Sequence, residues 1–359
     1  MLQPVLDIEE VTAFLESWAG GAVRGVSQFS NGHVSSVFGF EMVDGVDGLL
    51  KGADPDAESG KYIVRFVSPE NAEGLKKDRF IAPRAAAVGI PVPRVVKHGE
   101  VELAVANLSD EEKLYNPEES YPLGFAICDW MPGEHMDDLQ LEDRRFLIPT
   151  AVRSIDLISK IDISDTKGFG WFDGEGNAEY ETWRDYVASQ AFPLGGDNFY
   201  ERRRDWFVGR GGFLEESVFQ LVTDRMMSTM ERIPEVERSV VHMEFGFDNT
   251  LVVGDEVSAA LDWDNSIIGD HLYDGAWNDL HAPLFDYKQL FADQYAATGR
   301  VVESFDDRWL VCQLHVVLQA LQWFGVSKNE TAYHWTKARI LFLLGEGPAV
   351  GRQPAPYSS

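Results

Sequence analysis

The sequence predicts an α+β fold in two lobes, a small β-rich lobe with one main helix and a larger, mostly helical lobe. Up to Trp130, short runs rich in β-branched and aromatic residues alternate with turn-forming residues. Beyond Pro132 the apolar residues recur at helical spacing, and the 359 residues, 45% of them hydrophobic, can bury a sizeable core. We therefore predict an N-lobe at residues 1–130, a C-lobe at 131–345 and a poorly ordered tail at 346–359.

The N-lobe is expected to begin with a short amphipathic helix, Ile8–Trp18, which leads into a meander of strands. A second helix, Ala72–Val88, ends at Gly89 ahead of two prolines. Two segments rich in Gly and Asp or in acidic residues are predicted to be solvated connections, namely Val43–Lys61 and Asn107–Ser120. The expected strands are Val26–Phe29, Val37–Met42, Tyr62–Val67, Arg94–His98 and Phe125–Trp130.

The C-lobe is expected to consist of longer helices interrupted by a single apolar hairpin, Asn249–Trp263. The clearest helical periodicities cover Arg144–Lys160, Phe213–Arg232 and Arg308–Phe324. The sequence shows no internal repeat.

The charge balance argues against a nucleic-acid partner. Acidic residues number 59 against 31 basic ones, and the formal net charge of −28 would repel a phosphate backbone. Such acidity is typical of a surface adapted to high salt, and it would also suit a pocket for a cationic small molecule. Both interpretations are compatible with the sequence.

Neither a membrane segment nor a structural metal site is predicted. No run approaches the roughly 20 apolar residues that a membrane helix needs, and the first ten residues lack a signal-peptide pattern, so a cytoplasmic location is expected. Cys128 and Cys312 allow at most one disulfide and have no paired-cysteine metal spacing. The oligomeric state is left open.

One loop has the spacing of a phosphoryl-transfer catalytic loop. Such loops read His-x-Asp-x-x-x-x-Asn, in which the acid orients and deprotonates the attacking hydroxyl and the Asn holds a metal ion. Here His242, Glu244 and Asn249 occupy these places, with His242 predicted to shape the loop. Asp262, on the far side of the predicted hairpin, stands where a second acid would coordinate the metal that bridges nucleotide phosphates. The predicted catalytic set is therefore Glu244, Asn249 and Asp262, with Asn249 and Asp262 on the metal.

The region around this loop resembles the aminoglycoside phosphotransferase family, and its hygromycin-B phosphotransferase subfamily in particular. The similarity is carried by Ser239–Trp277, which includes Ile268-Gly269-Asp270, and by Thr166–Trp183 and Tyr62–Pro93. It extends from about Ser27 to about Leu280. The resemblance implies a protein-kinase-like fold and a kinase that uses ATP or GTP with Mg²⁺.

The resemblance also implies a set of nucleotide-binding residues. A loop over the phosphates would include Ser30, Gly32 and Ser35. Arg65 takes the place of the phosphate-binding Lys, and Asp78 the place of its acidic partner on the following helix. An interlobe hinge that includes Cys128 and Trp130 would bind adenine through its backbone.

The main departure from the family pattern is Glu244, where the family has Asp. The extra methylene displaces the carboxylate by more than about 1 Å, a misplacement that can cost about 100-fold in rate. Three alternatives follow: the backbone accommodates Glu244 as a working base, Asp248 replaces it, or the protein binds nucleotide without efficient transfer.

The predicted function is an ATP-dependent phosphotransferase acting on a hydroxyl of a small acceptor of the aminoglycoside or sugar and polyol class, and the acidic composition would suit a cationic acceptor. The alternative is a nucleotide-binding regulatory pseudokinase, which the change to Glu244 would favour. A protein kinase is disfavoured because no Ala-Pro-Glu motif follows Asp262.

Overall fold

The computed structural model describes residues 4–29, 35–43, 60–103, 122–191 and 213–348. Several predictions therefore lie outside the described residues: Ser30 and Gly32, nearly all of the connection 43–61, the acidic segment 107–120, and the tail from residue 349 onward.

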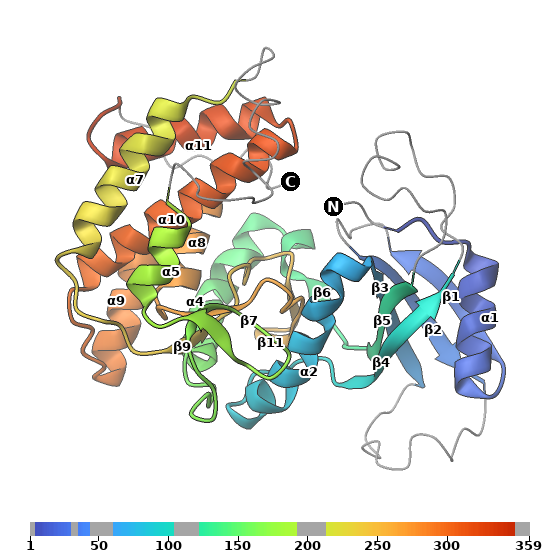
Figure 1. Ribbon diagram of the computed structural model, residues 1–359. Helices are drawn as coiled ribbons and strands as arrows, with labels where there is room; N and C mark the ends of the chain where they lie inside the picture. Colours follow the sequence, from blue (N-terminus) through green and yellow to red (C-terminus); the bar gives the residue numbers. More distant parts are fainter. Residues whose placement is uncertain (1–3, 30–34, 44–59, 104–121, 192–212, 349–359) are drawn as a thin grey trace.

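The N-lobe is built on a five-stranded antiparallel sheet with the order β1-β2-β3-β5-β4 in the described part of the chain (Figure 1). The predicted strands and the two predicted helices are all present. Their bounds are α1 Ile8–Ala19, β1 Val23–Phe29, β2 Ser36–Met42, β3 Lys61–Val67, α2 Ala72–Ala87, β4 Val95–Glu102 and β5 Pro122–Asp129.

The two faces of this sheet are covered differently. Helix α1 packs on one face, where the ring of Phe14 lies 5.7 Å from that of Phe66 and 4.9 Å from that of Phe125. On the other face, Val67 and Cys128 pack with Leu75 of α2. Arg65 of β3 therefore projects on the α2 side of the sheet, because strand residues two apart share a face.

Helix α2 also belongs to the hydrophobic core of the C-lobe. Phe80 and Ile81 are buried in that core, with the Phe80 ring 5.6 Å from that of Phe172. The side chain of Glu73 accepts a 2.9 Å hydrogen bond from the Gly174 N–H, and Arg84 forms a 2.7 Å ion pair with Asp165. Helix α2 thus connects the N-lobe sheet to the C-lobe, as Figure 1 shows.

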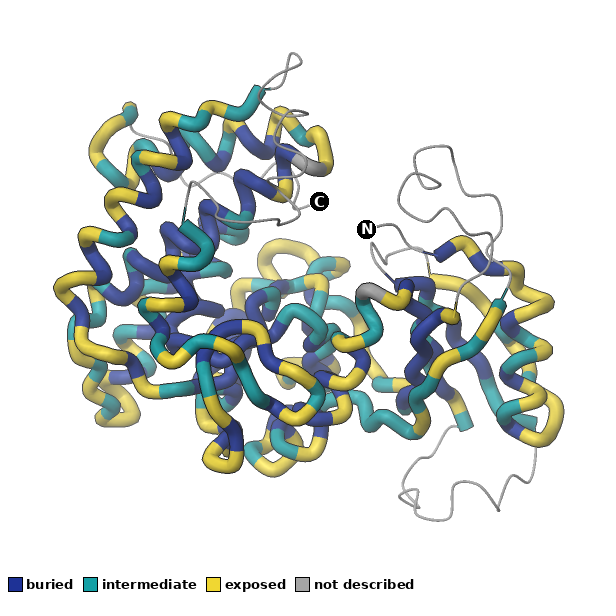
Figure 2. The backbone as a smooth tube through the Cα atoms, in the orientation of Figure 1, coloured by how far each residue is buried: buried dark blue, intermediate teal, exposed yellow. Residues whose placement is uncertain are grey.

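The C-lobe is mainly helical, and its interior contains the larger buried core seen in Figure 2. Its described helices are α4 Leu141–Ile158, α5 Trp183–Ser189, α7 Glu216–Met230, α8 Tyr273–His281, α9 Tyr287–Thr298, α10 Phe305–Val326 and α11 Glu330–Leu343. In the parts of the chain that the structure covers, no helix is both long and apolar enough to cross a membrane.

Two small sheets in the C-lobe go beyond the single predicted hairpin. One has the order β11-β10-β6 and the other β8-β7-β12-β9. The missed strands contain only two to four residues, too few for an alternating pattern to be recognised in the sequence. The strands are β6 Glu134–His135, β7 Phe169–Phe172, β8 Ala178–Tyr180, β9 Ser239–Val241, β10 Thr250–Val253, β11 Glu256–Ala260 and β12 Ile267–Gly269.

The link between the lobes contains Gly133, at a position where a larger residue does not fit. Gly133 has φ of +131°, and a Cβ built there would lie 2.5 Å from Ser258 Oγ and 2.8 Å from the Val252 carbonyl oxygen. We expect Gly133→Ala to lower the free energy of unfolding by about 1–3 kcal/mol, through backbone strain and this collision.

Urea unfolding measures this loss. Gly254→Ala is the matched control, since Gly254 also has positive φ but a Cβ there meets nothing within 4 Å. Equal losses in the two variants would contradict the role given to the collision.

Candidate active site

The predicted catalytic loop, residues 242–249, connects β9 to β10. Its His242 is fully buried, and Nε2 lies 2.8 Å from the Leu261 carbonyl oxygen, so Nε2 carries the proton and donates it. The ring packs 4.5 Å from that of Trp263. Burial lowers the pKa of His242 to about 4, which keeps the imidazole neutral. His242 thus ties the loop to the segment that contains Asp262.

Helix α8 holds the backbone of the loop through the side chain of Asp274. The carboxylate of Asp274 accepts the N–H of His242 at 2.9 Å and that of Met243 at 2.7 Å. Met243 has φ of +71°, a conformation that costs energy in a non-glycine residue and has to be held by its surroundings. Burial raises the pKa of Asp274 to about 7, and the two N–H bonds act against this rise.

We expect Asp274→Asn to destabilise the protein and to slow turnover. The amide would present N–H groups to one of the two loop N–H donors, and a buried unsatisfied donor costs about 1–3 kcal/mol. Thermal unfolding and kcat measured on the same preparation test this. Asp293→Asn on the exposed side of α9 is the control, and a shift no larger than in that variant would contradict the anchoring role.

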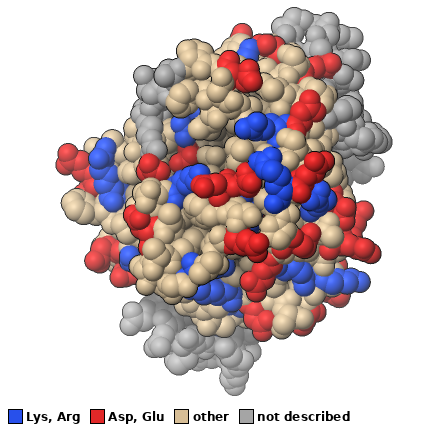
Figure 3. Space-filling view, turned by 90° about the vertical axis from the view of Figure 1, so that its left-hand side faces the viewer, with Lys and Arg blue, Asp and Glu red and all other residues tan. Residues whose placement is uncertain are grey.

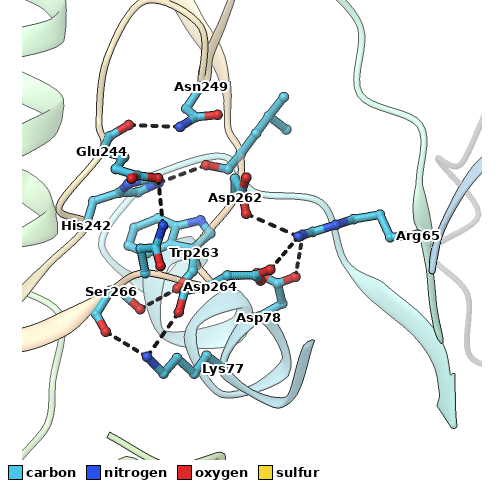
Figure 4. Close-up of polar contacts among 12 residues, drawn as sticks. Arg65, Lys77, Asp78, His242, Glu244, Asn249, Asp262, Trp263, Asp264 and Ser266 are labelled. Atoms are coloured by element: carbon cyan, nitrogen blue, oxygen red, sulfur yellow. Dashed lines mark hydrogen bonds and ion pairs between the residues drawn. The ribbon is translucent and has the colours of Figure 1, made fainter. Parts of the chain in front are cut away.

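Glu244, the predicted base, points into the site rather than away from it (Figure 4). Its Oε2 accepts a 2.9 Å hydrogen bond from Asn265 Nδ2. Burial raises the pKa of Glu244 to about 7, and the bond from Asn265 acts against the shift. Asp248, the alternative acid, is exposed, and its carbonyl oxygen is bound by His135 Nδ1 at 2.6 Å.

Asp262 lies just beyond β11 and faces a cation from the other lobe. Its Oδ1 is 3.1 Å from Arg65 Nη2, which is also 2.8 Å from Asp264 Oδ2, while Nη1 is 2.9 Å from Asp78 Oδ2. Burial alone would lower the pKa of Arg65, but the carboxylates of Asp264, Asp262 and Asp78 raise it well above its usual value. The predicted Arg65–Asp78 pair is present, and it is part of a larger group in which three carboxylates share one guanidinium.

The excess negative charge and the oxygen donors in this group suit a divalent cation. Asn249 donates its side-chain N–H to the Glu244 carbonyl oxygen at 3.0 Å, which leaves its amide oxygen as the atom for a metal. Asp262 is the more exposed acid, with 45% of its side chain accessible. Among the described residues, no group of three His, Cys, Asp or Glu side chains could hold a metal alone. Mg²⁺ fits this pattern, since it commonly binds one or two protein oxygens together with phosphates and water.

The remaining predicted nucleotide residues that the structure describes lie in or next to strands of the N-lobe sheet. Cys128 lies inside β5, one residue before that strand ends, and burial raises its thiol pKa to about 12. Trp130 follows the strand, is 38% exposed and packs 5.8 Å from the ring of Phe29. Ser35 is buried immediately before β2. The structure therefore brings Arg65 and Asp78 to the predicted catalytic residues, with Cys128 inside β5 and Trp130 in the segment that follows it.

Comparison with known proteins identifies the family. Residues 54–279, which include Arg65 and the whole predicted catalytic loop, match the model of the phosphotransferase enzyme family, APH. The chain belongs to this family. The resemblance to aminoglycoside phosphotransferases and the prediction of a small-molecule kinase are thereby confirmed, and so is the kinase-like fold.

Individual APH relatives agree with this assignment. The chain is 28% identical to hygromycin-B 4-O-kinase of Escherichia coli over 277 residues, which cover 77% of this chain and 67% of that protein. A thermostable mutant of aminoglycoside phosphotransferase APH(4)-Ia, in a ternary complex with AMP-PNP and hygromycin B, has a TM-score of 0.69 at 25% identity, with 95% of this chain and 100% of that chain covered. A putative fructosamine-3-kinase from Haemophilus somnus 129PT shares the fold alone, with a TM-score of 0.54, 12% identity and coverage of 93% and 97%.

Some members of this APH site were not anticipated from the sequence. Asp264, two residues after Asp262, could have been suspected as a second acid of the same segment. Asp274 lies in a segment that carried the family resemblance, but its two bonds to the loop depend on how α8 packs. Lys77 gave no signal, because a lysine in a charged helical run is usually solvated.

Proposed function

We propose that this chain transfers the γ-phosphoryl group of ATP, or of GTP, to a hydroxyl group of a small acceptor in the presence of Mg²⁺. The observation that carries the proposal is the convergence of Glu244, Asn249 and Asp262 with Arg65 at one site between the lobes. Phosphoryl transfer depends mainly on positioning and charge neutralisation, which such a set can provide.

Each residue would have a distinct part. Glu244 would orient the acceptor hydroxyl and take its proton as the new P–O bond forms and the bond to the leaving phosphate breaks. Asn249 and Asp262 would hold Mg²⁺, and the bound ion would neutralise charge on the nucleotide phosphates. Arg65, which contacts Asp262, would bind phosphate oxygens while Asp78 keeps its guanidinium in place.

The acceptor is proposed to be an aminoglycoside or another sugar or polyol. The net charge of −28 favours a cationic ligand, and the similarity to a hygromycin-B kinase supports the class. On the C-lobe face in Figure 3, however, Asp and Glu are spread over the surface and interspersed with Lys and Arg. The likeness to a fructosamine kinase shows that the fold alone does not select one acceptor.

The test is nucleotide turnover with ATP or GTP and Mg²⁺, at low and at molar salt, with a panel of aminoglycosides and sugar alcohols. Acceptor-stimulated turnover that yields a phosphorylated acceptor by mass spectrometry supports the proposal and names the acceptor class. Nucleotide binding without turnover under every condition would overturn it in favour of the regulatory alternative.

A further inference from the structure

Lys77 of α2 is a buried lysine that binds the backbone next to Asp262. Its Nζ donates to the carbonyl oxygen of Asp264 at 3.0 Å and to that of Ser266 at 2.9 Å (Figure 4). Only 4% of the residue is exposed, whereas lysines are rarely buried unless their charge has partners. Lys77 thus links helix α2, which also contacts the N-lobe sheet, to the turn that follows Asp262, the predicted metal ligand.

The surroundings of the ammonium group form a specific cage. The ring centroid of Trp171 lies 4.5 Å from Nζ and that of Phe172 lies 4.8 Å away, so strand β7 adds two aromatic rings to the two carbonyl oxygens around the ammonium group. The neighbouring Asp78 binds Arg65. Consecutive residues of α2 therefore hold both the phosphate-binding cation and the turn at residues 263–266.

That turn is closely fitted to α2. Ser266 closes it through its backbone N–H and its hydroxyl, which both donate to the Trp263 carbonyl oxygen, at 3.0 and 2.6 Å. A Cβ added at Gly74 would lie 2.8 Å from Asp264 Cγ, which shows how close the helix comes. Asp262 itself has φ of +60°, a conformation that persists in a non-glycine residue only when its surroundings impose it.

We propose that Lys77 is a positioning residue for metal binding: by holding the carbonyls of Asp264 and Ser266, it fixes the backbone that aims the Asp262 carboxylate. This inference rests on the proposed function. Without Lys77, two buried carbonyl oxygens lose their donor and the turn relaxes. Loss of a group that supports a metal ligand typically weakens metal affinity or activity by 10–100-fold.

The experiment compares Lys77→Met with Lys76→Met, which removes the neighbouring lysine, an exposed residue paired with Glu73. Calorimetry of AMP-PNP binding at increasing Mg²⁺, together with kcat and the thermal unfolding temperature, gives the readouts. We expect the Mg²⁺ concentration for half-maximal nucleotide binding to rise about 10-fold or more in Lys77→Met and to stay within about 2-fold in Lys76→Met. Should Lys77→Met not fold, Lys77→Gln, which keeps one amide group as donor, is expected to give a smaller rise.

The outcomes separate this inference from the proposed function. If the wild-type chain shows no Mg²⁺-dependent nucleotide binding, the proposed function fails whatever Lys77 does. If the wild type binds, but the folded Lys77 variants have its Mg²⁺ dependence and only a lower unfolding temperature, then Lys77 serves stability alone and the inference is wrong.

Discussion

Asp262→Asn is expected to reduce acceptor-dependent phosphoryl transfer by about 10³-fold or more. The substitution keeps the size of the side chain but removes the charge that would hold Mg²⁺ against the nucleotide phosphates, and charge-stabilising groups act on this scale in phosphoryl transfer. Initial rates at saturating nucleotide and acceptor, with Mg²⁺ varied, measure the loss.

The same variant should fold at least as well as the wild type. Three carboxylates surround Arg65, so the removal of one relieves their mutual repulsion and leaves Asp78 and Asp264 to pair with the guanidinium. Asp255→Asn, on the exposed turn of the same hairpin, is the matched control and should retain full activity. Equal activity in the two variants would remove Asp262 from the mechanism.

Glu244→Gln is expected to lower kcat by about 10²–10⁴-fold, the usual contribution of a general base. The wild-type kcat/KM should rise with pH through about 7, because burial raises the pKa of Glu244 to about 7 and only the ionised form accepts a proton. A pH profile of kcat/KM from about 5.5 to about 8.5 tests both statements. The midpoint of the rise is expected to fall within about one pH unit of the pKa given for Glu244. In Glu244→Gln this rising limb should be absent, and its persistence would assign the limb to another group.

Glu244→Asp separates the alternatives raised by the unusual acid. The bond from Asn265 to Oε2 indicates that the site is shaped for the longer side chain. We therefore expect Glu244→Asp to lose about 10–100-fold in kcat, because the shorter carboxylate falls short of its place. A gain of activity would show that Glu244 impairs transfer, and a large loss in Asp248→Asn alone would transfer the base role to Asp248.

The N-lobe could be predicted closely because each of its strands is a run of seven or eight residues. Most of these runs are rich in β-branched and aromatic residues and are bounded by turn-forming residues, which makes them recognisable in the sequence. Residues Tyr62–Val67 were expected as a strand and form β3 together with Lys61. In the C-lobe the hairpin of β10 and β11 was expected, but the other strands escaped prediction because they are too short, as β9 and β12 have three residues each. Their pairing depends on contacts between distant segments, which no local pattern encodes.

The site was predictable where function imposes a fixed spacing on the chain. Glu244 and Asn249 follow from the spacing of one loop, whereas Arg65 and Asp78 were implied by the resemblance to the aminoglycoside phosphotransferase family. Lys77 could not be found in this way, because its partners lie 187 and 189 residues further along the chain. Only the folded structure distinguishes it from its exposed neighbour Lys76.

The attachment of α2 to the C-lobe bears on how such an enzyme would be controlled. A helix that could swing outward would separate Asp78 from Arg65 and so provide an off state. Here α2 is held against the C-lobe, which contains the predicted catalytic loop, by the ring packing of Phe80, the ion pair of Arg84 and the hydrogen bond to Glu73. We therefore expect that this kinase needs no activating rearrangement of α2 once it has folded. Its rate of phosphoryl transfer would then depend on the amount of protein and on the concentrations of nucleotide and acceptor rather than on an activating signal.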